Sequence, residues 1–157
     1  MNKKIVYIDM DGVLVDFKKG VERFKKLGSP DHFDWMVAGA KGEVSDIEGI
    51  FSHFPPMAGA LDAFAELSEK FEVFILSTAP WNNPSAWTDK RLWVEDHIGE
   101  GGHKRLILSH HKHLCAGDFL IDDRTTHGVD KFKGEHIHFG SEAFPGWSSV
   151  LEYLRTV

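Results

Sequence analysis

Short runs of apolar residues that favour strands alternate with longer amphipathic stretches along most of the chain. The first run, residues 5–8 (IVYI), predicts a buried strand. Similar runs predict strands at residues 71–76, 105–108, 119–121 and 135–139. Because helical patterns separate these strands, the sequence predicts an α/β fold with a doubly wound, Rossmann-like parallel sheet and right-handed crossovers.

Apolar residues recur at helical spacing between most of the predicted strands. The pattern predicts helices over residues 60–67, from Asn83-Pro84 to Gly99, and around residues 150–154. Each of these helices would connect or follow neighbouring strands of the sheet, which is the arrangement that covers a parallel sheet.

Residues 17–56 form an extra helical segment between the first strand and the regular alternation. The helical spacing of Phe17, Val21, Phe24 and Leu27 predicts a first helix that ends at Gly28. Residues 31–44 carry no clear pattern, and a capping box from Ser45 to Glu48 predicts a second helix over residues 45–54. The chain is therefore expected to form an α/β core from residues 1–16 and 57–157, with a helical insertion at residues 17–56.

Composition excludes some functions. The 157 residues fit one main core, and the net charge of −6 argues against a nucleic-acid partner, which would require a basic surface. Cys115 is the single cysteine, so we expect no internal disulfide and a reducing compartment. No signal peptide and no apolar run of ~18 residues is evident. We expect a cytoplasmic protein without a membrane partner, and a homodimer is left open.

Two carboxylates follow the first strand directly. Asp9 and Asp11 would point to the same side if the chain stays extended, and Gly12 allows a turn after them. Two close carboxylates repel each other unless a cation offsets their charge, and oxygen ligands favour Mg²⁺. An ordinary acidic turn is the alternative, because Asp-Gly is common in turns.

Polar side chains also follow the other predicted strands. Ser77 and Thr78 end the second, Lys112 follows the third, and Asp122 and Asp123 end the fourth. Singly, each has an ordinary explanation as a loop start or a solvated turn. Because ligands bind at the carboxyl ends of parallel strands, together they predict a crevice where carboxylates hold Mg²⁺ and donors bind a phosphate.

The ordered strings DMDGVLVD, FILST and LIDD resemble motifs of the haloacid dehalogenase superfamily of phosphotransferases, with Lys112 in the place of the lysine of motif three. The resemblance implies that Asp9 is a nucleophile and Asp11 a general acid/base. It also implies that residues 17–56 are a small helical cap inserted between the first two motifs.

Longer strings resemble the bacterial 5′(3′)-deoxyribonucleotidases: DMDGVLVDF, FPPMAGALDAF, STAPWNNPSAWTDKRLWVEDHIG and HHKHLCAGDFLIDDRT. The resemblance implies Mg²⁺-dependent hydrolysis of deoxynucleoside monophosphates through an aspartyl-phosphate. It implies metal ligation by Asp9, by the backbone carbonyl of Asp11, and by Asp123 or, in second place, Asp122. It further implies phosphate or substrate contacts by five residues, namely Ser77, Thr78, Lys112, Lys90 and Phe17. Core packing is the alternative for Phe17, and a solvated helix surface for Lys90.

The chain departs from the animal members of this group in two places. They carry a lysine shortly after the second motif, where this chain has Pro80-Trp81-Asn82, and a Phe-Trp pair in the cap, for which Phe33 and Trp35 are approximate candidates.

Three other readings remain open from the sequence. The protein could be a phosphatase of the same superfamily that acts on another small phosphate ester. It could also be a non-catalytic phosphate- or Mg²⁺-binding module of the same fold. The histidines of residues 110–113 (HHKH) offer a weaker zinc alternative, because no cysteine or spaced partner supports them.

Overall fold

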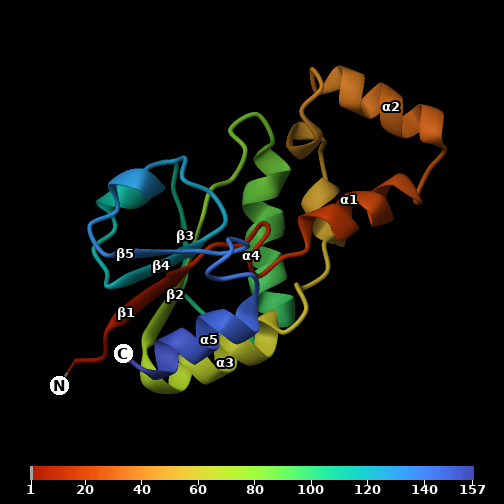
Figure 1. Cartoon of the computed structure of the whole chain (residues 1–157). Helices are drawn as coiled ribbons and strands as arrows, with labels where there is room; N and C mark the ends of the chain where they lie inside the picture. Colours follow the sequence, from red (N-terminus) through yellow and green to blue (C-terminus); the bar gives the residue numbers. More distant parts are fainter. Residues whose placement is uncertain (1) are drawn as a thin grey trace.

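The computed structural model describes residues 2–157, and their centre is a five-stranded parallel sheet (Figure 1). Its strands are β1 (Ile5–Ile8), β2 (Glu72–Ser77), β3 (Leu106–Leu108), β4 (Phe119–Asp122) and β5 (Glu135–His138). The strand order is β3-β2-β1-β4-β5, so β1 lies at the centre with β2 and β4 as its parallel neighbours. The structure confirms the predicted α/β fold class.

The described residues form five α-helices and five short 3₁₀ turns, which lie between the strands or follow the last one. The helices are α1 (Phe17–Lys25), α2 (Pro30–Gly39), α3 (Ala60–Lys70), α4 (Pro84–His97) and α5 (Trp147–Arg155). The 3₁₀ turns are η1 (Val44–Asp46), η2 (Ile50–His53), η3 (Gly99–Gly102), η4 (Lys112–Leu114) and η5 (Val129–Lys131). Among the described residues, no helix combines the length and the apolar character needed to cross a bilayer.

The two faces of the sheet are covered differently. Val6 and Ile8 of β1 point into the main apolar core, which they share with buried residues of α3, α4 and α5. Tyr7 points to the other face because side chains alternate along a strand. There it packs with Leu76, Leu120 and Val129 in a smaller cluster beside the turns η4 and η5.

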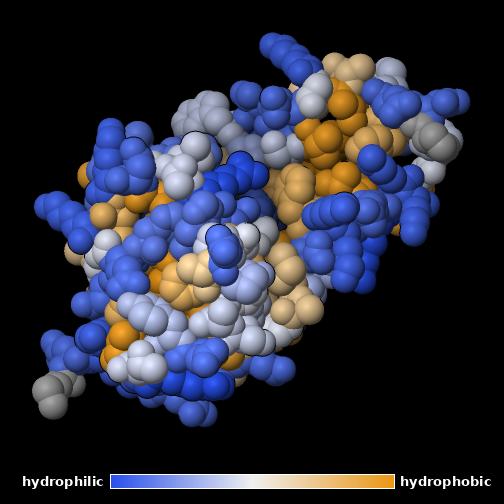
Figure 2. All heavy atoms as spheres, in the orientation of Figure 1, coloured by the Kyte–Doolittle hydropathy of each residue, from blue (hydrophilic) through white to orange (hydrophobic). Residues whose placement is uncertain are grey.

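Residues 17–56 leave the sheet and return to it through one narrow connection. The backbone N–H of Asp16 donates to the carbonyl of Pro55 (2.9 Å), and that of Met57 donates to Leu14 (2.8 Å). The outgoing and returning chains therefore run side by side. Helices α1 and α2 stand to one side of the sheet (Figure 1), and apolar side chains gather where these two helices face each other (Figure 2).

The predicted single helix over residues 45–54 is wrong. The structure has the two turns η1 and η2 there, separated by Gly49 with a positive φ of 76°. That left-handed conformation interrupts a helix and is accessible to glycine at little cost. Ser45 lies inside η1 and does not cap a helix, whereas the unassigned stretch before it contains α2.

Candidate active site

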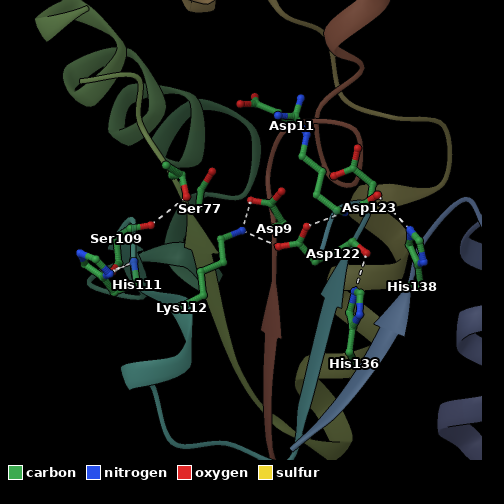
Figure 3. Close-up of polar contacts among 12 residues, drawn as sticks. Asp9, Asp11, Ser77, Ser109, His111, Lys112, Asp122, Asp123, His136 and His138 are labelled. Atoms are coloured by element: carbon green, nitrogen blue, oxygen red, sulfur yellow. Dashed lines mark hydrogen bonds and ion pairs between the residues drawn. The ribbon is translucent and has the colours of Figure 1, made fainter. Parts of the chain in front are cut away.

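The carboxyl ends of β1 and β4 and the turn η4 meet at one buried ion-pair cluster (Figure 3). Asp9 follows β1 and is buried, as is Asp122 at the end of β4. The ammonium of Lys112 reaches both carboxylates from η4, at 3.0 Å from Asp9 Oδ1 and 2.5 Å from Asp122 Oδ2. The convergence follows from the parallel sheet, because β1 and its neighbour β4 present their carboxyl ends at the same edge.

A second buried ammonium joins Asp11 to Ser77. Lys90 lies on α4 and is only 1% exposed. Its Nζ is 2.7 Å from Asp11 Oδ2, donates to Ser77 Oγ over 3.2 Å, and lies 4.8 Å from the ring centre of Phe51. The surface-solvation alternative for Lys90 is therefore wrong, because the side chain points inward to the strand ends.

Three carboxylates form a compact acidic cluster beside Lys112. Oxygens of Asp9, Asp122 and Asp123 lie within 4.8 Å of one another. Both oxygens of Asp122 are engaged, one with Lys112 and the other with the backbone N–H of Arg124 at 2.9 Å. Asp123 Oδ1 is buried and has no hydrogen-bond partner. Of the two acids after β4, Asp123 is thus the one with a carboxylate oxygen still free for a ligand.

Gly12 permits the close approach of this cluster to the turn after β1. Its φ of 77° lies in the left-handed region, and a Cβ at this position would collide with the Asp123 carboxylate. The Asp-Gly step is therefore part of the site geometry as well as a turn.

Burial and neighbouring charges shift the pKa values of the site. Burial raises the pKa of Asp11, against the opposing effect of Lys90. Burial, followed by the charges of Asp9 and Asp122, raises the pKa of Asp123 to about 6. For Lys112, burial alone would lower the pKa, but the carboxylates of Asp9 and Asp122 outweigh it and raise the pKa. Lys112 is therefore held as an ammonium.

Two other expected residues lie at the site, but with different environments. Thr78 lines the cleft, while its hydroxyl donates to the backbone carbonyl of Ser109 at 2.8 Å. Phe17 also lines the cleft, with its ring centre 5.0 Å from that of Phe54 and 6.1 Å from that of Phe51. Phe17 therefore both borders the cleft and packs in the aromatic cluster beneath it.

A cleft of about 590 Å³ lies above these residues, within the size range of small-molecule sites. One side, here called the core wall, consists of strand ends and the loops after them. The other side, the cap wall, consists of residues 42–46 of the helical insertion. The two walls are tied together by Asn83, which is buried and donates its amide to the carbonyls of Ser45 (2.9 Å) and Ile47 (2.8 Å).

Some expected residues are not brought to the cleft. Phe33 is buried against α1 and borders a separate hollow, whereas Trp35 is 71% exposed on α2. Among the described residues, the acidic cluster is the only group of three or more metal-ligating side chains, so the histidines of residues 110–113 do not form a zinc site. His110 instead borders the cleft beside Trp81.

The cleft contains residues that the sequence analysis did not assign. They are Pro80 and Trp81 after β2, His110 after β3, and Arg124, Thr126 and His127 after β4. All of them follow strand ends by only a few residues, so extending the strand-end rule would have found them. The cap-wall residues carry no such signal, because their position depends on the path of the insertion.

Two histidines of β5 brace the acids after β4 from behind (Figure 3). Nε2 of His136 lies 3.0 Å from the carbonyl of Asp122, and Nε2 of His138 lies 3.1 Å from the carbonyl of Asp123. Because a carbonyl only accepts, each Nε2 carries the proton and donates it. The two rings stack with centres 5.2 Å apart, which fixes the main chain that carries both acids.

The fold is similar to solved structures of haloacid dehalogenase-like hydrolases. A superposition on the HAD-hydrolase YfnB from Bacillus subtilis, in a form bound to magnesium, has a TM-score of 0.66 at 8% identity and covers 98% of this chain and 99% of that one. L-2-haloacid dehalogenase from Xanthobacter autotrophicus gives a TM-score of 0.54 at 14% identity, over 87% and 76% of the two chains. These likenesses show that the chain has the haloacid dehalogenase fold.

Sequence comparison defines the family more closely. Residues 44–144 match the family "5' nucleotidase, deoxy (Pyrimidine), cytosolic type C protein". A protein of Vibrio phage KVP40 assigned the name 5′(3′)-deoxyribonucleotidase is 52% identical over 155 residues, which are 99% of this chain and 86% of that protein. The cytosolic-type 5′(3′)-deoxyribonucleotidase of Homo sapiens is 29% identical over 167 residues, covering 93% and 78%. The chain belongs to this deoxyribonucleotidase family and is a phosphoric monoester hydrolase, so the non-catalytic alternative is wrong.

Proposed function

We propose that the protein hydrolyses deoxyribonucleoside 5′- or 3′-monophosphates with Mg²⁺ as cofactor and Asp9 as the nucleophile. The observation that carries the proposal is the placement of Asp9, which lies between the ammonium of Lys112 and the acidic cluster on the floor of the cleft. The names of the relatives support the choice of a deoxyribonucleotide substrate.

The residues present fit a magnesium ion. The cluster offers only oxygen ligands, which Mg²⁺ prefers, and it includes the buried, unpartnered oxygen of Asp123. Asp9, Asp123 and the backbone carbonyl of Asp11 would hold the ion, while Asp122 stays with Lys112 and positions it. When bound, Mg²⁺ would screen the repulsion between the Asp9 carboxylate and a phosphate dianion.

Asp9 and Asp11 carry the two chemical steps in this proposal. The Asp9 carboxylate attacks phosphorus and forms an aspartyl-phosphate, while the bond from phosphorus to the sugar oxygen breaks. Asp11 gives its proton to that oxygen, for which its raised pKa is suited. Asp11 then accepts a proton from the water that attacks the aspartyl-phosphate, which releases phosphate and restores Asp9.

Lys112 and Ser77 are placed to stabilise negative charge on the phosphoryl oxygens. Lys112 contacts Asp9 directly, and Ser77 lines the same floor. Lys90 joins Ser77 to Asp11 and so aligns the donor of the leaving proton with the phosphate site. Thr78 contributes less through its hydroxyl, which is held by Ser109.

Residues 17–56 act in this proposal as the cap, which limits water in the cleft and selects the leaving group. The net charge of −6 supports a small monoester over a polynucleotide, which would require a basic surface. The cytosolic type of the human relative supports a cytoplasmic location.

The experiment is phosphate release from a panel of monophosphates, with Mg²⁺ or with EDTA. The panel contains dUMP, dTMP, dGMP, UMP, 3′-dUMP and several sugar phosphates. We expect Mg²⁺-dependent release that is fastest with deoxynucleotides. Activity confined to sugar phosphates would contradict the substrate assignment and leave the phosphatase chemistry in place, and equal rates in EDTA would contradict the metal assignment.

A further inference from the structure

Trp81 presents the most exposed aromatic surface of the core wall. It follows Ser77 by four residues, borders the cleft, and is 77% exposed. An exposed aromatic side chain is unremarkable when it stands alone on a surface. Trp81 is different because it stands at the mouth of the cleft whose floor holds Asp9.

The position of Trp81 is fixed by its neighbours. The indole N–H of Trp87 donates to the carbonyl of Pro80 (3.3 Å), which anchors the main chain just before Trp81. The Trp81 ring meets Trp87 at 6.5 Å and 77°, and His110 at 6.0 Å and 69°. Both contacts are close to perpendicular, so neither neighbour stacks in parallel on the Trp81 ring. The indole is therefore held in place while much of its surface remains open to solvent.

The two phenylalanines that line the cleft are already packed against other groups. Phe51 is 3% exposed and lies under the ammonium of Lys90. Phe17 packs edge to face against Phe51 and Phe54.

The cap wall opposite, residues 42–46, contains no aromatic side chain and carries the carboxylates of Glu43 and Asp46. Trp35 lies on α2, outside the residues that line the cleft. A planar group in the cleft thus finds its open aromatic partner on the core wall.

We propose that Trp81, braced by His110 and Trp87, is the platform on which the planar base of the leaving nucleoside stacks. This inference rests on the proposed function, since it assumes a nucleotide substrate. Because every base has a π face, a stacking platform accepts more than one base and favours nucleotides over ring-free esters. The base is then held by a loop of the rigid sheet domain, and its binding does not require an aromatic pair from the cap.

The test compares substrates with and without a base in matched variants. Trp81→Ala should raise KM for dUMP at least about tenfold, equivalent to about 1.4 kcal/mol, and leave KM for 2-deoxyribose 5-phosphate unchanged. Trp81→Phe should restore most of the affinity, because it keeps an aromatic face. Trp35→Ala is the matched comparison, because it removes a similarly exposed indole outside the cleft, and KM for dUMP should stay at the wild-type value.

Several results would overturn the inference. An equal KM increase for both substrates in Trp81→Ala would indicate a structural role alone. A KM increase in Trp35→Ala with none in Trp81→Ala would place the base on the cap. If the wild-type enzyme had the same KM for dUMP and for 2-deoxyribose 5-phosphate, the stacking role of Trp81 would be contradicted, while the proposed phosphatase chemistry would stand.

A separate result would concern the proposed function. If wild-type enzyme hydrolysed neither ester, the proposed function would fail. Calorimetric binding of dUMP to wild type and Trp81→Ala would then decide the stacking inference independently: weaker binding by the variant supports it, and equal binding overturns it.

Discussion

The two walls of the cleft are built by different means. The core wall is fixed by the sheet, which brings Asp9 and Asp122 to adjacent strand ends with Lys112 between them. The cap wall consists of a 3₁₀ turn and the residues before it, and it is tied to α4 by the amide of Asn83. Buried ion pairs hold the core wall, whereas hydrogen bonds from the side-chain amide of Asn83 to backbone carbonyls hold the cap wall.

This difference separates the buried charged groups from the cap wall. Charged groups that must act together lie on the core wall, where parallel strands fix their separations. The cap wall bounds the cleft and contributes no residue to the buried ion pairs of its floor. Changes at the buried ion pairs of the core wall should therefore act on catalysis and metal binding, whereas changes in the cap wall should act on KM and local stability.

The largest expected effect is the loss of Asp9, the proposed nucleophile. Asp9→Asn should lower kcat at least about a thousandfold, because an amide does not attack phosphorus, while Lys112 keeps its contact with Asp122 and the fold survives. Glu43→Gln, the corresponding change of a cleft-lining acid in the cap wall, should alter kcat by a few-fold at most. Steady-state kinetics with a circular-dichroism check of folding would measure both. Similar losses in the two variants would contradict the division between the walls.

Asp122 and Asp123 are neighbours on the core wall and should respond in opposite ways. Asp123 has a pKa of about 6 against an ordinary value of 3.8, so its protonated form is favoured in the folded state. The protonated Asp123 therefore contributes to the free energy of unfolding. This contribution is complete below pH ~3.8 and is lost as the pH rises through 6. Asp123→Asn should therefore stabilise the metal-free protein at pH 7–8, by on the order of 1 kcal/mol, with a smaller gain below pH 6.

Burial raises the pKa of Asp122 as well, but its carboxylate accepts hydrogen bonds from Lys112 and from the backbone N–H of Arg124, whereas Asp123 Oδ1 has no partner. Asp122→Asn should therefore destabilise the protein by about 1–3 kcal/mol, because both donors lose a charged acceptor. Chemical unfolding in EDTA between pH 5 and 8 measures both variants. Calorimetry with Mn²⁺ as a probe should show weaker binding in Asp123→Asn. Stabilisation by Asp122→Asn, or unchanged Mn²⁺ affinity in Asp123→Asn, would reverse our assignment of the two acids.

Most of the core wall could be predicted from the sequence, and the cap wall could not. Strand geometry places the side chains at the carboxyl ends of β1, β2 and β4, so the positions of Asp9, Ser77 and Asp122 follow from the strand pattern. Lys90 lies on a helix whose apolar pattern is weak, so only the family resemblance indicated its role. The path of the cap wall depends on Gly49, whose left-handed conformation breaks the helix that the Ser45 pattern favoured.

The smallest expected effect concerns the tie between the walls. Asn83→Ala should leave the carbonyls of Ser45 and Ile47 without their buried donor, at a cost of about 1–3 kcal/mol, and should raise KM several-fold because the cap wall loosens. Asn82→Ala is the matched control, since Asn82 is exposed and donates only to Asp46 (3.2 Å). Urea unfolding and KM for dUMP measure both changes. If the two variants behave alike, Asn83 does not tie the walls.

The most direct test of the account is to find the phosphoryl group on the protein. Asp11→Asn lacks the base that activates water, so the intermediate should accumulate with p-nitrophenyl phosphate, whose leaving group does not need the proton of Asp11. Acid quenching followed by peptide mass spectrometry should place one phosphoryl group on Asp9. The claim that Asp9 is the nucleophile would be contradicted if phosphate were released while Asp9 carried no phosphoryl group at any time. It would also be contradicted if the phosphoryl group were found on another residue.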